Sequence, residues 1–566
     1  MNDSRFTHKN INRFSLFIVL IPMAVYLAVL IPSLVNFPYY DDYFWYNKVF
    51  LRAQGRSFID QLVLSTHQES DHRIIFLKGT GLLLAALGPF DFRVPIVLSN
   101  GLFFLFTAHL TFSLYRVTRN WVFIIPIAFL LYQFLPYTVA FSYGIHDQAV
   151  ILFFYIAFFY VWKTDRLAVG LTGLAAILCV LSSTNGLILP PILAVIYGLT
   201  HRFRLAIGYG LLTVLSFGAY FHNYQWNVGT IASVPIQDRI VASYLFLAEI
   251  MGSYANNNLA FGRVMAQAVG SLIIGFTGWL LWRLITQIDW KRWYLPPVSS
   301  QSADARRHLL LTAVSMLGFI LLTGLLIIYN RYSGIDRQNN IVAHYRQYSS
   351  FALSFCYLAG LLFARERTWK RSYVLGSILL AVLSNLATYA YIHHDLRSYT
   401  LSLQADTYNW QTNRSILFLP PIIGEQAWQT LTNEMEVSYD CHILAPPPAI
   451  QEARSVSGVL PATVCPVFDG LLVTVNEPDQ RLSYLRTAFL VLRNAQTSYY
   501  LPYINPLHTL RVALRKLALM NPVGHALISR SIPDFVLPPG RYEAFLLDDD
   551  QHTIQPLSTS ITIPEN

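Results

Sequence analysis

Charged residues are scarce in this chain. Only 13% of its 566 residues are Asp, Glu, Lys or Arg, whereas an ordinary soluble protein carries about 25%. Hydrophobic residues make up 54%, and the mean hydropathy is +0.42. This composition argues against a soluble globular enzyme and against a disordered chain, because both need more charge to stay in water. The sequence therefore predicts that the lipid bilayer is the main solvent of the protein.

Two features that would point to other functions are missing. The chain has no Gly-rich phosphate-binding loop, so we expect no nucleotide ligand. Within residues 1–394, the charged side chains fall in the connections between apolar runs or near the ends of the runs, as Arg263 does. A transporter or flippase would place ionisable residues at the middle of the bilayer. Transport of a lipid-linked glycan is therefore the least supported alternative.

The charges divide the chain into two regions. Residues 1–394 contain 29 basic and 15 acidic residues, a net charge of +14, whereas residues 395–566 contain 11 basic and 16 acidic residues, a net charge of −5. The first region has long apolar runs, and the second has ordinary soluble patterning with Pro-rich turns. We predict a membrane domain over 1–394 and a soluble domain over 395–566. The overall charge of +9 reflects this organisation, and no nucleic-acid partner is expected.

A helix needs about 20 apolar residues to cross the hydrocarbon core, and about eleven runs meet or approach this length. They are 14–36, 94–115, 120–141, 148–163, 167–182, 186–200, 205–222, 261–284, 308–329, 347–364 and 372–393. The predicted fold is an α-helical polytopic membrane protein with a C-terminal, mainly β, soluble domain. The run Ile74–Leu87 is too short to cross and contains Lys78, so we place it at the membrane interface, within a first outer loop over 37–93.

The basic residues also predict the orientation. With the N-terminus in the cytoplasm, the inner connections hold 18 Lys and Arg residues against 5 acids, whereas the outer segments hold 11 against 10. This asymmetry follows the positive-inside rule. An odd number of spans then places the C-terminal domain outside, which in a bacterium means a multi-pass protein of the inner membrane with a periplasmic domain. No small-residue cleavage site follows the first apolar run, so we expect it to remain as a signal anchor.

The C-terminal domain is predicted to be β-sandwich-like with helices. Its predicted helices are 395–410, 424–437 and 507–519, and its predicted strands are 470–475, 487–493, 497–503, 541–547 and 560–563. Asp548–Gln551 is predicted to form a hairpin loop. Cys441 and Cys465 are the only cysteines of this domain, and we expect a disulfide between them because disulfides persist outside the cytoplasm.

Acidic and aromatic residues gather in the first outer loop. Asp41 and Asp42 follow the first span, with Tyr40 and Trp45 beside them. A carboxylate there can act as a general base, and the rings can stack on a sugar or lie in the interfacial belt. A solvated acidic loop has the same pattern and is the alternative interpretation.

Other polar residues lie at further outer tips. They include the candidate substrate ligands His146, Asp147 and Arg331, together with Arg337 and Arg346. Arginines are less expected on the outer side, and they bind phosphate through paired hydrogen bonds, so a lipid phosphate or pyrophosphate would explain them. Phospholipid headgroups would satisfy the same residues without catalysis.

A third cluster, His67 to Arg73, precedes the interfacial run. His72 and Arg73, next to Lys78, form a second candidate anion site. The His-x-Glu-x-Asp-His spacing of 67–72 can also be drawn as a metal site, but this interpretation is weaker because the spacing matches no defined ligand set. We assign no metal and no cofactor, and a divalent ion stays open as an alternative.

This arrangement resembles the GT-C superfamily of integral-membrane glycosyltransferases. The likeness lies in one span, an acidic pair a few residues into the first outer loop, an interfacial helix in that loop, about eleven spans and an outer C-terminal domain. The segment from Asp71 to Pro95 is similar to the part of the family where the interfacial helix ends before the second span, and Tyr345-Arg346-Gln347-Tyr348 is similar to its Arg-Tyr element near the donor phosphate. The chain has Asp-Asp where the mannosyl and aminoarabinosyl branches have Asp-Glu, which leaves the donor sugar open.

The resemblance implies transfer of a sugar from a polyprenyl-phosphate donor to an acceptor outside the membrane, with inversion at the anomeric carbon. The acceptor would be a cell-surface glycan, lipopolysaccharide O-antigen or a protein. It implies Asp41 as the base, with Asp42 second, and Arg346, Arg337 and Arg73 as phosphate ligands, with Lys78 and His72 behind them. An O-antigen ligase or polymerase acting on lipid-linked oligosaccharide is the alternative enzyme class.

Overall fold

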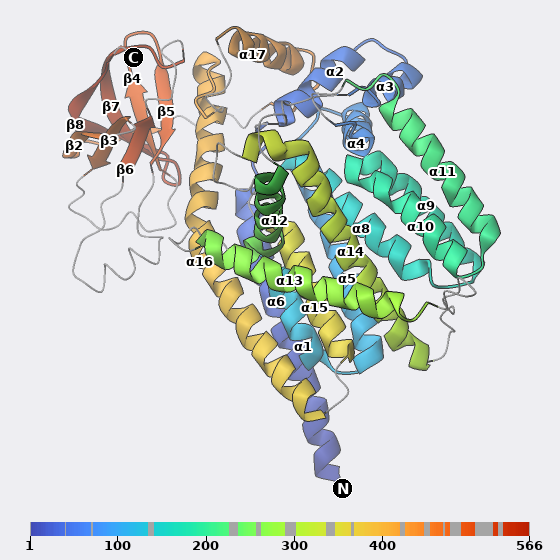
Figure 1. Cartoon of the computed structure of the whole chain (residues 1–566). Helices are drawn as coiled ribbons and strands as arrows, with labels where there is room; N and C mark the ends of the chain where they lie inside the picture. Colours follow the sequence, from blue (N-terminus) through green and yellow to red (C-terminus); the bar gives the residue numbers. More distant parts are fainter. Residues whose placement is uncertain are drawn as a thin grey trace. The chain divides into compact units, whose positions relative to one another are not determined.

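The structure, a computed structural model, describes the chain apart from residues 1, 40, 69–71, 134–140, 226–235, 256–261, 289–301, 336–345, 364–366, 419–424, 447–452, 468–469, 476–487, 504–524, 530–535 and 565–566. It is mainly helical, with a strand-containing C-terminal region (Figure 1). The helices are α1 (Asn2–Leu30), α2 (Lys48–Ala53), α3 (Phe58–Ser65), α4 (Ile75–Leu87), α5 (Arg93–Thr118), α6 (Ile125–Leu131), α8 (Ile145–Tyr160), α9 (Arg166–Ser182), α10 (Leu189–Leu199), α11 (Phe203–Phe221), α12 (Ile236–Gly252), α13 (Gly262–Ile285), α14 (Ser302–Ile335), α15 (Arg346–Phe363), α16 (Arg367–Asn413) and α17 (Glu425–Asp440). The strands are β1 (Arg454–Ser455), β2 (Ala462–Val467), β3 (Gly470–Val475), β4 (Ala488–Arg493), β5 (Ser498–Pro502), β6 (His525–Ser529), β7 (Gly540–Asp548) and β8 (Thr553–Ile563).

Among the described residues, seven helices are long and apolar enough to cross a membrane. They are Asn12–Ser33, Arg93–Thr118, Ser142–Tyr160, Phe203–Phe221, Gly262–Ile285, Ala305–Ile328 and Lys370–Tyr389. Each coincides with one of the eleven predicted spans. At the other four predicted spans the structure has shorter or more polar helical segments, which are Trp121–Leu131, Arg166–Ser182, Thr184–Leu199 and Arg346–Phe363. The chain thus has the helices of a polytopic membrane protein, and Ile75–Leu87 is a short apolar helix as predicted.

Local sequence explains where the short spans break. The Asp165 side chain caps α9 by accepting a hydrogen bond from the backbone N–H of Ala168 at 2.8 Å. The backbone is extended at Ser183, so α9 ends there, and Pro190 then supplies a favourable first turn for α10. The two runs are therefore separate helices, as the Ser- and Gly-containing break between them predicts.

α12 was not among the predicted spans, because the sequence places Asp238–Glu249 in an outer segment. The structure instead forms a helix there and packs it antiparallel against α13. A Cβ on Gly252 would clash with the carbonyl oxygen of Ala266, so only glycine permits this approach of the two backbones. The buried carboxylate of Glu249 pairs with Arg263 at 2.9 Å, which offsets the cost of its burial.

The chain divides into two compact units. The first comprises Met1–Ile31, Leu62–Thr80 and Ile96–Tyr389, and the second comprises Pro32–Gln61, Gly81–Pro95 and Ala390–Asn566. The division inside α16 falls close to the predicted boundary at 394, but α16 is one continuous helix where two were predicted, at 372–393 and 395–410. Much of the first outer loop belongs to the second unit, which the sequence did not predict.

Backbone contacts explain why the outer loop joins the C-terminal region in the second unit. Phe90 exchanges hydrogen bonds with the segment after α17: its N–H donates to the carbonyl of Ile443 at 2.6 Å, and its carbonyl accepts from the N–H of Ala445 at 2.9 Å. The rings of Tyr39 and Tyr399 also meet edge to face, with centroids 4.6 Å apart.

Two sheets form the C-terminal part of the second unit. One has the order β1-β8-β7-β4-β5 and the other β2-β3-β6, and residues of both share one apolar core. In β4, Leu490 faces this core, whereas Phe489 faces a second core that includes Leu401 of α16. The continuous apolar run of β4 follows from burial on both faces. The predicted hairpin at 548–551 joins β7 to β8, and the predicted helix over 507–519 lies outside the described residues.

In the first unit, α8, α9, α10 and α11 lie side by side (Figure 1). The connections that the sequence assigns to the cytoplasm contact one another at one end of this unit, which we call the basic end. The contacts join Trp121 to Asn12, Arg202 to Lys163, Arg306 to Leu362 and Lys370 to Phe123.

Candidate functional site

The starts of α8 and α15 bring the first polar residues together. Nε2 of Gln148 donates a hydrogen bond to Oε1 of Gln347 at 2.9 Å, and both side chains are buried. Buried amides need such partners because they have lost their contacts with water. α8 ends at Tyr160, next to Lys163, and α15 ends beside Leu362, so their starts lie at the end of the first unit opposite the basic end.

The short turn between α9 and α10 extends this set of contacts. Nδ2 of Asn185 donates to the hydroxyl of Tyr348 at 3.2 Å. Oγ1 of the neighbouring Thr184 lies 3.3 Å from Nδ1 of His72 and shares a further hydrogen bond with the hydroxyl of Tyr220. Residues far apart in the sequence are thus joined through hydrogen bonds.

We call this set of side chains the polar network. Its members are His72, Gln148, Thr184, Asn185, Tyr220, Gln347 and Tyr348. They come from predicted outer segments or from the outer ends of predicted spans, and all are partly or fully buried. Such a buried, hydrogen-bonded set can hold polar ligand groups in fixed geometry.

Two predicted substrate ligands flank the network on α8. His146 and Asp147 precede Gln148, and Nε2 of the histidine lies 3.5 Å from Oδ1 of the aspartate. Nδ1 of the histidine bonds to the carbonyl of Tyr143 at the start of the helix, which fixes the orientation of the ring. Asp147 is only 8% exposed, so its carboxylate can serve a ligand only from inside the site.

Arg346 adjoins the network as the first described residue of α15 and is half-buried. A helix start carries partial positive charge, so a cation there opposes the helix dipole, whereas an anion bound beside it is favoured. α5 and α9 also begin with arginines, Arg93 and Arg166, but those side chains are exposed. Arg346 is thus the predicted phosphate ligand whose environment best suits an anion.

Arg73 has a different environment from the one predicted. Its guanidinium donates to the carbonyl oxygens of Ala219 and His222, and its backbone N–H donates to the Tyr220 hydroxyl at 3.2 Å. These carbonyls belong to the C-terminal end of α11, so Arg73 caps that helix. Its buried Nε has no hydrogen-bond partner within the described part of the chain and is the atom left for a ligand.

Lys78 is not a surface cation. Its side chain is fully buried, and Nζ donates to the carbonyl oxygen of His67 at 2.7 Å. The ammonium therefore holds the segment before α4 in place, a role that the sequence did not predict. In the 67–72 segment, whose spacing gave the weaker metal-site alternative, Glu69 and Asp71 lie outside the described residues. The described residues contain no group of three metal-binding side chains.

The acidic pair belongs to the second unit, and its two members differ. Asp42 is 2% exposed, and its carboxylate accepts a hydrogen bond from the backbone N–H of Tyr39 at 3.1 Å, which stabilises the turn before Tyr43. Asp41 is half-buried, so a substrate can reach its carboxylate more readily. Trp45 is only 8% exposed, which leaves little of its ring for stacking on a sugar.

The other predicted residues have simpler outcomes. Tyr40 and Arg337 lie outside the described residues, as does the side chain of Arg331 on α14. Cys441 and Cys465 are both described, and both are exposed free thiols, so the predicted disulfide is not formed in this structure. The Cys441 sulfur instead accepts a hydrogen bond from Nε2 of Gln54 at 3.0 Å, and Cys465 lies within β2.

Sequence reasoning missed several members of the network. Gln148 and Gln347 lie at the ends of predicted spans, and Tyr220 lies within one, so they were not among the candidate site residues. The signal that could have found them is the polar side chain at the end of an apolar run, because a buried amide or hydroxyl requires a partner. Thr184 lies in the turn between two predicted spans, but a sequence alone cannot show that His72 is its partner.

Comparisons of the chain with protein-family models, with curated proteins and with solved structures give no match. A functional proposal therefore rests on the chemistry and geometry of the chain itself.

Proposed function

We propose that the protein is an integral-membrane glycosyltransferase that moves a sugar from a polyprenyl-phosphate donor to an acceptor outside the membrane, with inversion. The observation that carries the proposal is the polar network, which joins His72 to the starts of α8 and α15 and adjoins Arg346. It lies opposite the basic end, as a site for a donor in the outer leaflet requires. The resemblance of the sequence to the GT-C superfamily, with about eleven predicted spans and an acidic pair in the first outer loop, adds support.

In this proposal Asp41 removes the proton from an acceptor hydroxyl, and the acceptor oxygen attacks the anomeric carbon of the sugar. The bond between that carbon and the donor phosphate oxygen breaks, and polyprenyl phosphate leaves with the bonding electron pair. The proton on Asp41 is then released to water. Negative charge grows on the phosphate as it leaves, so a fixed cation such as Arg346 lowers the barrier. Arg73 and Arg337, of which Arg337 lies outside the described residues, are further candidate cations, and Asp42 holds the turn that carries Asp41.

The orientation has its own support. The contacts of the basic end join the connections that hold the excess of Lys and Arg, which agrees with the N-terminus and these connections in the cytoplasm. The C-terminal region then lies on the outer side of a bacterial inner membrane. There it would hold a glycan acceptor.

The test begins with cells that contain or lack the protein. Mass analysis of their surface glycans should show one sugar residue missing without the protein, which identifies donor and acceptor together. Loss of a whole oligosaccharide would favour an O-antigen ligase or polymerase, and no change in any glycan would contradict the proposal.

The purified protein in nanodiscs then separates binding from transfer. With the lipid-linked sugar so identified, Asp41→Asn should bind the donor normally and reduce transfer by about 10²-fold or more, as loss of a general base does. Asp91→Asn is the matched control, because this carboxylate belongs to the same loop and is already paired with Arg93, at a distance of 2.6 Å. Normal transfer by both Asp41→Asn and Asp42→Asn would disprove the proposed base.

A further inference from the structure

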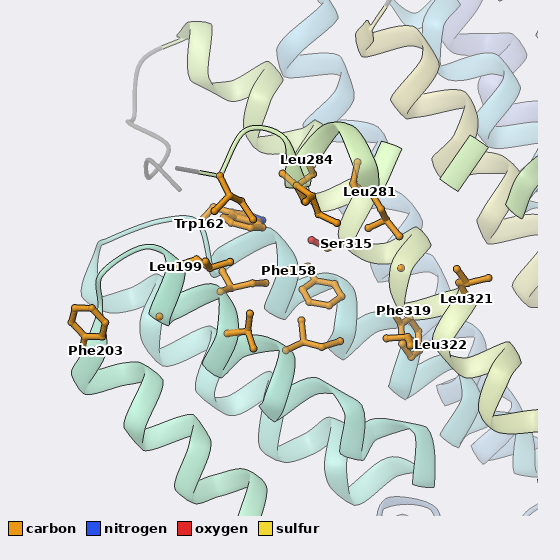
Figure 2. Close-up of a pocket in the computed structure, with 18 residues that line it drawn as sticks. Phe158, Trp162, Leu199, Phe203, Leu281, Leu284, Ser315, Phe319, Leu321 and Leu322 are labelled. Atoms are coloured by element: carbon orange, nitrogen blue, oxygen red, sulfur yellow. The ribbon is translucent and has the colours of Figure 1, made fainter. Parts of the chain in front are cut away.

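A large apolar cavity lies near the basic end of the first unit. Its volume is about 790 Å³, and it is lined by residues of α8, α10, α13 and α14 and their ends, together with Phe203 at the start of α11. Figure 2 shows Phe158, Trp162 and Leu199 opposite Leu281 and Leu284, with the Ser315 hydroxyl among them. Almost all lining residues are apolar or glycine, so water in this space would find few partners.

The cavity has a buried floor and an exposed apolar rim. On the floor, Phe158 and Phe319 are fully buried. On the rim, Val195 is 61% exposed and Phe203 is 59% exposed. Exposed apolar side chains of this size on a membrane protein face lipid, so the mouth of the cavity opens toward the hydrocarbon of the bilayer.

The volume decides what kind of ligand fits. A cavity of about 150 Å³ inside a protein stays dry and accepts one benzene molecule. The present cavity is about five times larger, which gives room for a long hydrocarbon chain. Van der Waals contact with such a chain replaces the contacts that an empty space of this size would lose.

Polar groups at the cavity indicate that the chain carries a polar head. The Nε1 of Trp162, a residue 2% exposed, has no hydrogen-bond partner among the described residues. Cations also flank the lining residues in the sequence: Lys163 follows Trp162, Arg204 follows Phe203, and Arg283 lies between two lining leucines. Arg204 and Arg283 are exposed, so an anionic headgroup can reach them.

We propose that this cavity binds an acyl chain of an anionic phospholipid from the leaflet at the basic end. The chain fills the space above Phe158, the Trp162 N–H donates to an oxygen of the lipid, and its phosphate lies near Lys163, Arg204 and Arg283. Phe158 lies 10 residues beyond Gln148 on α8, about 15 Å along the helix axis, so this site is separate from the polar network. The proposal does not depend on the transferase activity.

Trp162 itself provides the probe. The full chain is reconstituted into vesicles that contain phosphatidylglycerol with brominated acyl chains, since bromine quenches tryptophan fluorescence on contact. The emission of Trp162 is taken as the difference between the unmodified protein and Trp162→Phe. Because Trp162 is buried, its emission is quenched only if an acyl chain enters the cavity. We expect more than half of it to be lost, and less loss with brominated phosphatidylcholine.

Two glycines give a matched pair of variants. Gly318 lines the cavity and has room for a side chain, so Gly318→Leu should fill part of the space and reduce the quenching of Trp162 several-fold. Gly275 of α13 also has open space around it but does not line the cavity, so Gly275→Leu should leave the quenching unchanged. If Gly318→Leu does not fold, the double variant Arg204→Gln/Arg283→Gln replaces it, and phosphatidylglycerol should then quench no more than phosphatidylcholine.

Three results would overturn the proposal. The first is Trp162 emission that brominated phosphatidylglycerol does not quench. The second is equal quenching by brominated phosphatidylcholine in the unmodified protein. The third comes from competition: polyprenyl phosphate, added as the competitor in place of excess unlabelled phosphatidylglycerol, restores the emission. The last result would assign the cavity to an isoprenoid chain.

Discussion

In the first unit, arginines at the C-terminal ends of helices have a different role from an arginine at the start of a helix. Arg73, Arg202 and Arg306 each donate to backbone carbonyls at or just beyond a helix C-terminus, those of α11, α8 and α15. The last carbonyls of a helix lack partners within the helix and carry partial negative charge, so these guanidinium groups stabilise the helices that they cap. Arg346 lies at the start of α15, where the helix offers it no such acceptor. The role of an arginine in this unit therefore depends on the helix end beside it more than on its charge. An arginine at a C-terminal end caps the helix, whereas an arginine at a start is a candidate ligand for an anion.

The largest expected effect concerns the orientation of the protein in the membrane, that is, the side on which Cys441 and Cys465 lie. Cys441 and Cys465 are exposed, whereas Cys179 is buried. A membrane-impermeant maleimide should therefore label the protein in intact spheroplasts, and Cys441→Ser/Cys465→Ser should abolish the labelling. Labelling only after lysis would reverse the proposed orientation. A requirement for reductant would show that the predicted disulfide forms in the cell, contrary to the free thiols of this structure.

The second prediction concerns Arg346. Arg346→Gln should reduce sugar transfer by about 10²–10³-fold, the cost of removing one fixed group that stabilises transition-state charge. The thermal unfolding midpoint of the variant, measured in parallel, separates a loss of transfer from a loss of folded protein. Arg346→Lys should retain part of the activity, since it keeps the charge but loses the paired hydrogen bonds. Equal activity in all three proteins would remove Arg346 from the site.

Arg202, the capping arginine at the basic end, should show the reverse pattern. Arg202→Gln should lower the free energy of unfolding by about 1–3 kcal/mol, because buried carbonyl oxygens lose a charged donor. Denaturant unfolding in detergent measures this loss, and transfer per folded molecule should stay near its original value. Arg371→Gln is the control, since Arg371 is exposed at the same end and its replacement should change stability by no more than about 0.5 kcal/mol. If Arg202→Gln were as stable as this control, the capping role would be wrong.

The smallest predicted effect extends the comparison to a negative charge. The buried carboxylate of Asp406 accepts backbone N–H bonds from Leu417 at 2.7 Å and Phe418 at 3.1 Å, yet burial raises the pKa of Asp406 to about 7. The folded state then holds a proton that the unfolded state releases, so stability is fully present below the ordinary Asp pKa and is lost as pH rises through about 7. Between pH 6 and pH 8 we expect a loss of about 1 kcal/mol.

Thermal unfolding of the second unit at several pH values measures this loss. Asp406→Asn should lower stability at pH 6 and remove this part of the pH dependence, because the amide cannot accept both N–H bonds or titrate. An unchanged pH dependence in the variant would exclude Asp406 as its source.

Much of the helical framework could be predicted from the sequence. Each described helix of membrane length coincides with a predicted span, because a run of about 20 apolar residues has few other stable environments. α12 escaped prediction because Glu249 made its segment look like a polar loop. The burial of Glu249 depends on Arg263, which lies on another helix, and the local sequence pattern does not indicate that these two residues form a pair.

The candidate site was predictable only in part. Polar residues next to apolar runs indicated His72, Asp147 and Arg346 as candidates, and the structure places all three at one end of the first unit. The sequence could not separate Arg73 from Arg346, because the acceptors of Arg73 lie nearly 150 residues away, at the end of α11. It also could not show that Lys78 is buried against the carbonyl of His67.

The sequence by itself determined the solvent of this protein and the division of its charges, because composition and run length act locally and add up along the chain. Only the tertiary structure decided which of those charges are already compensated. A carbonyl, carboxylate or ring offsets a charge only at short distance, and folding alone brings such groups from separate helices within that distance. For this reason, the polar network, the capping arginines and the apolar cavity could be identified only from the packed helices.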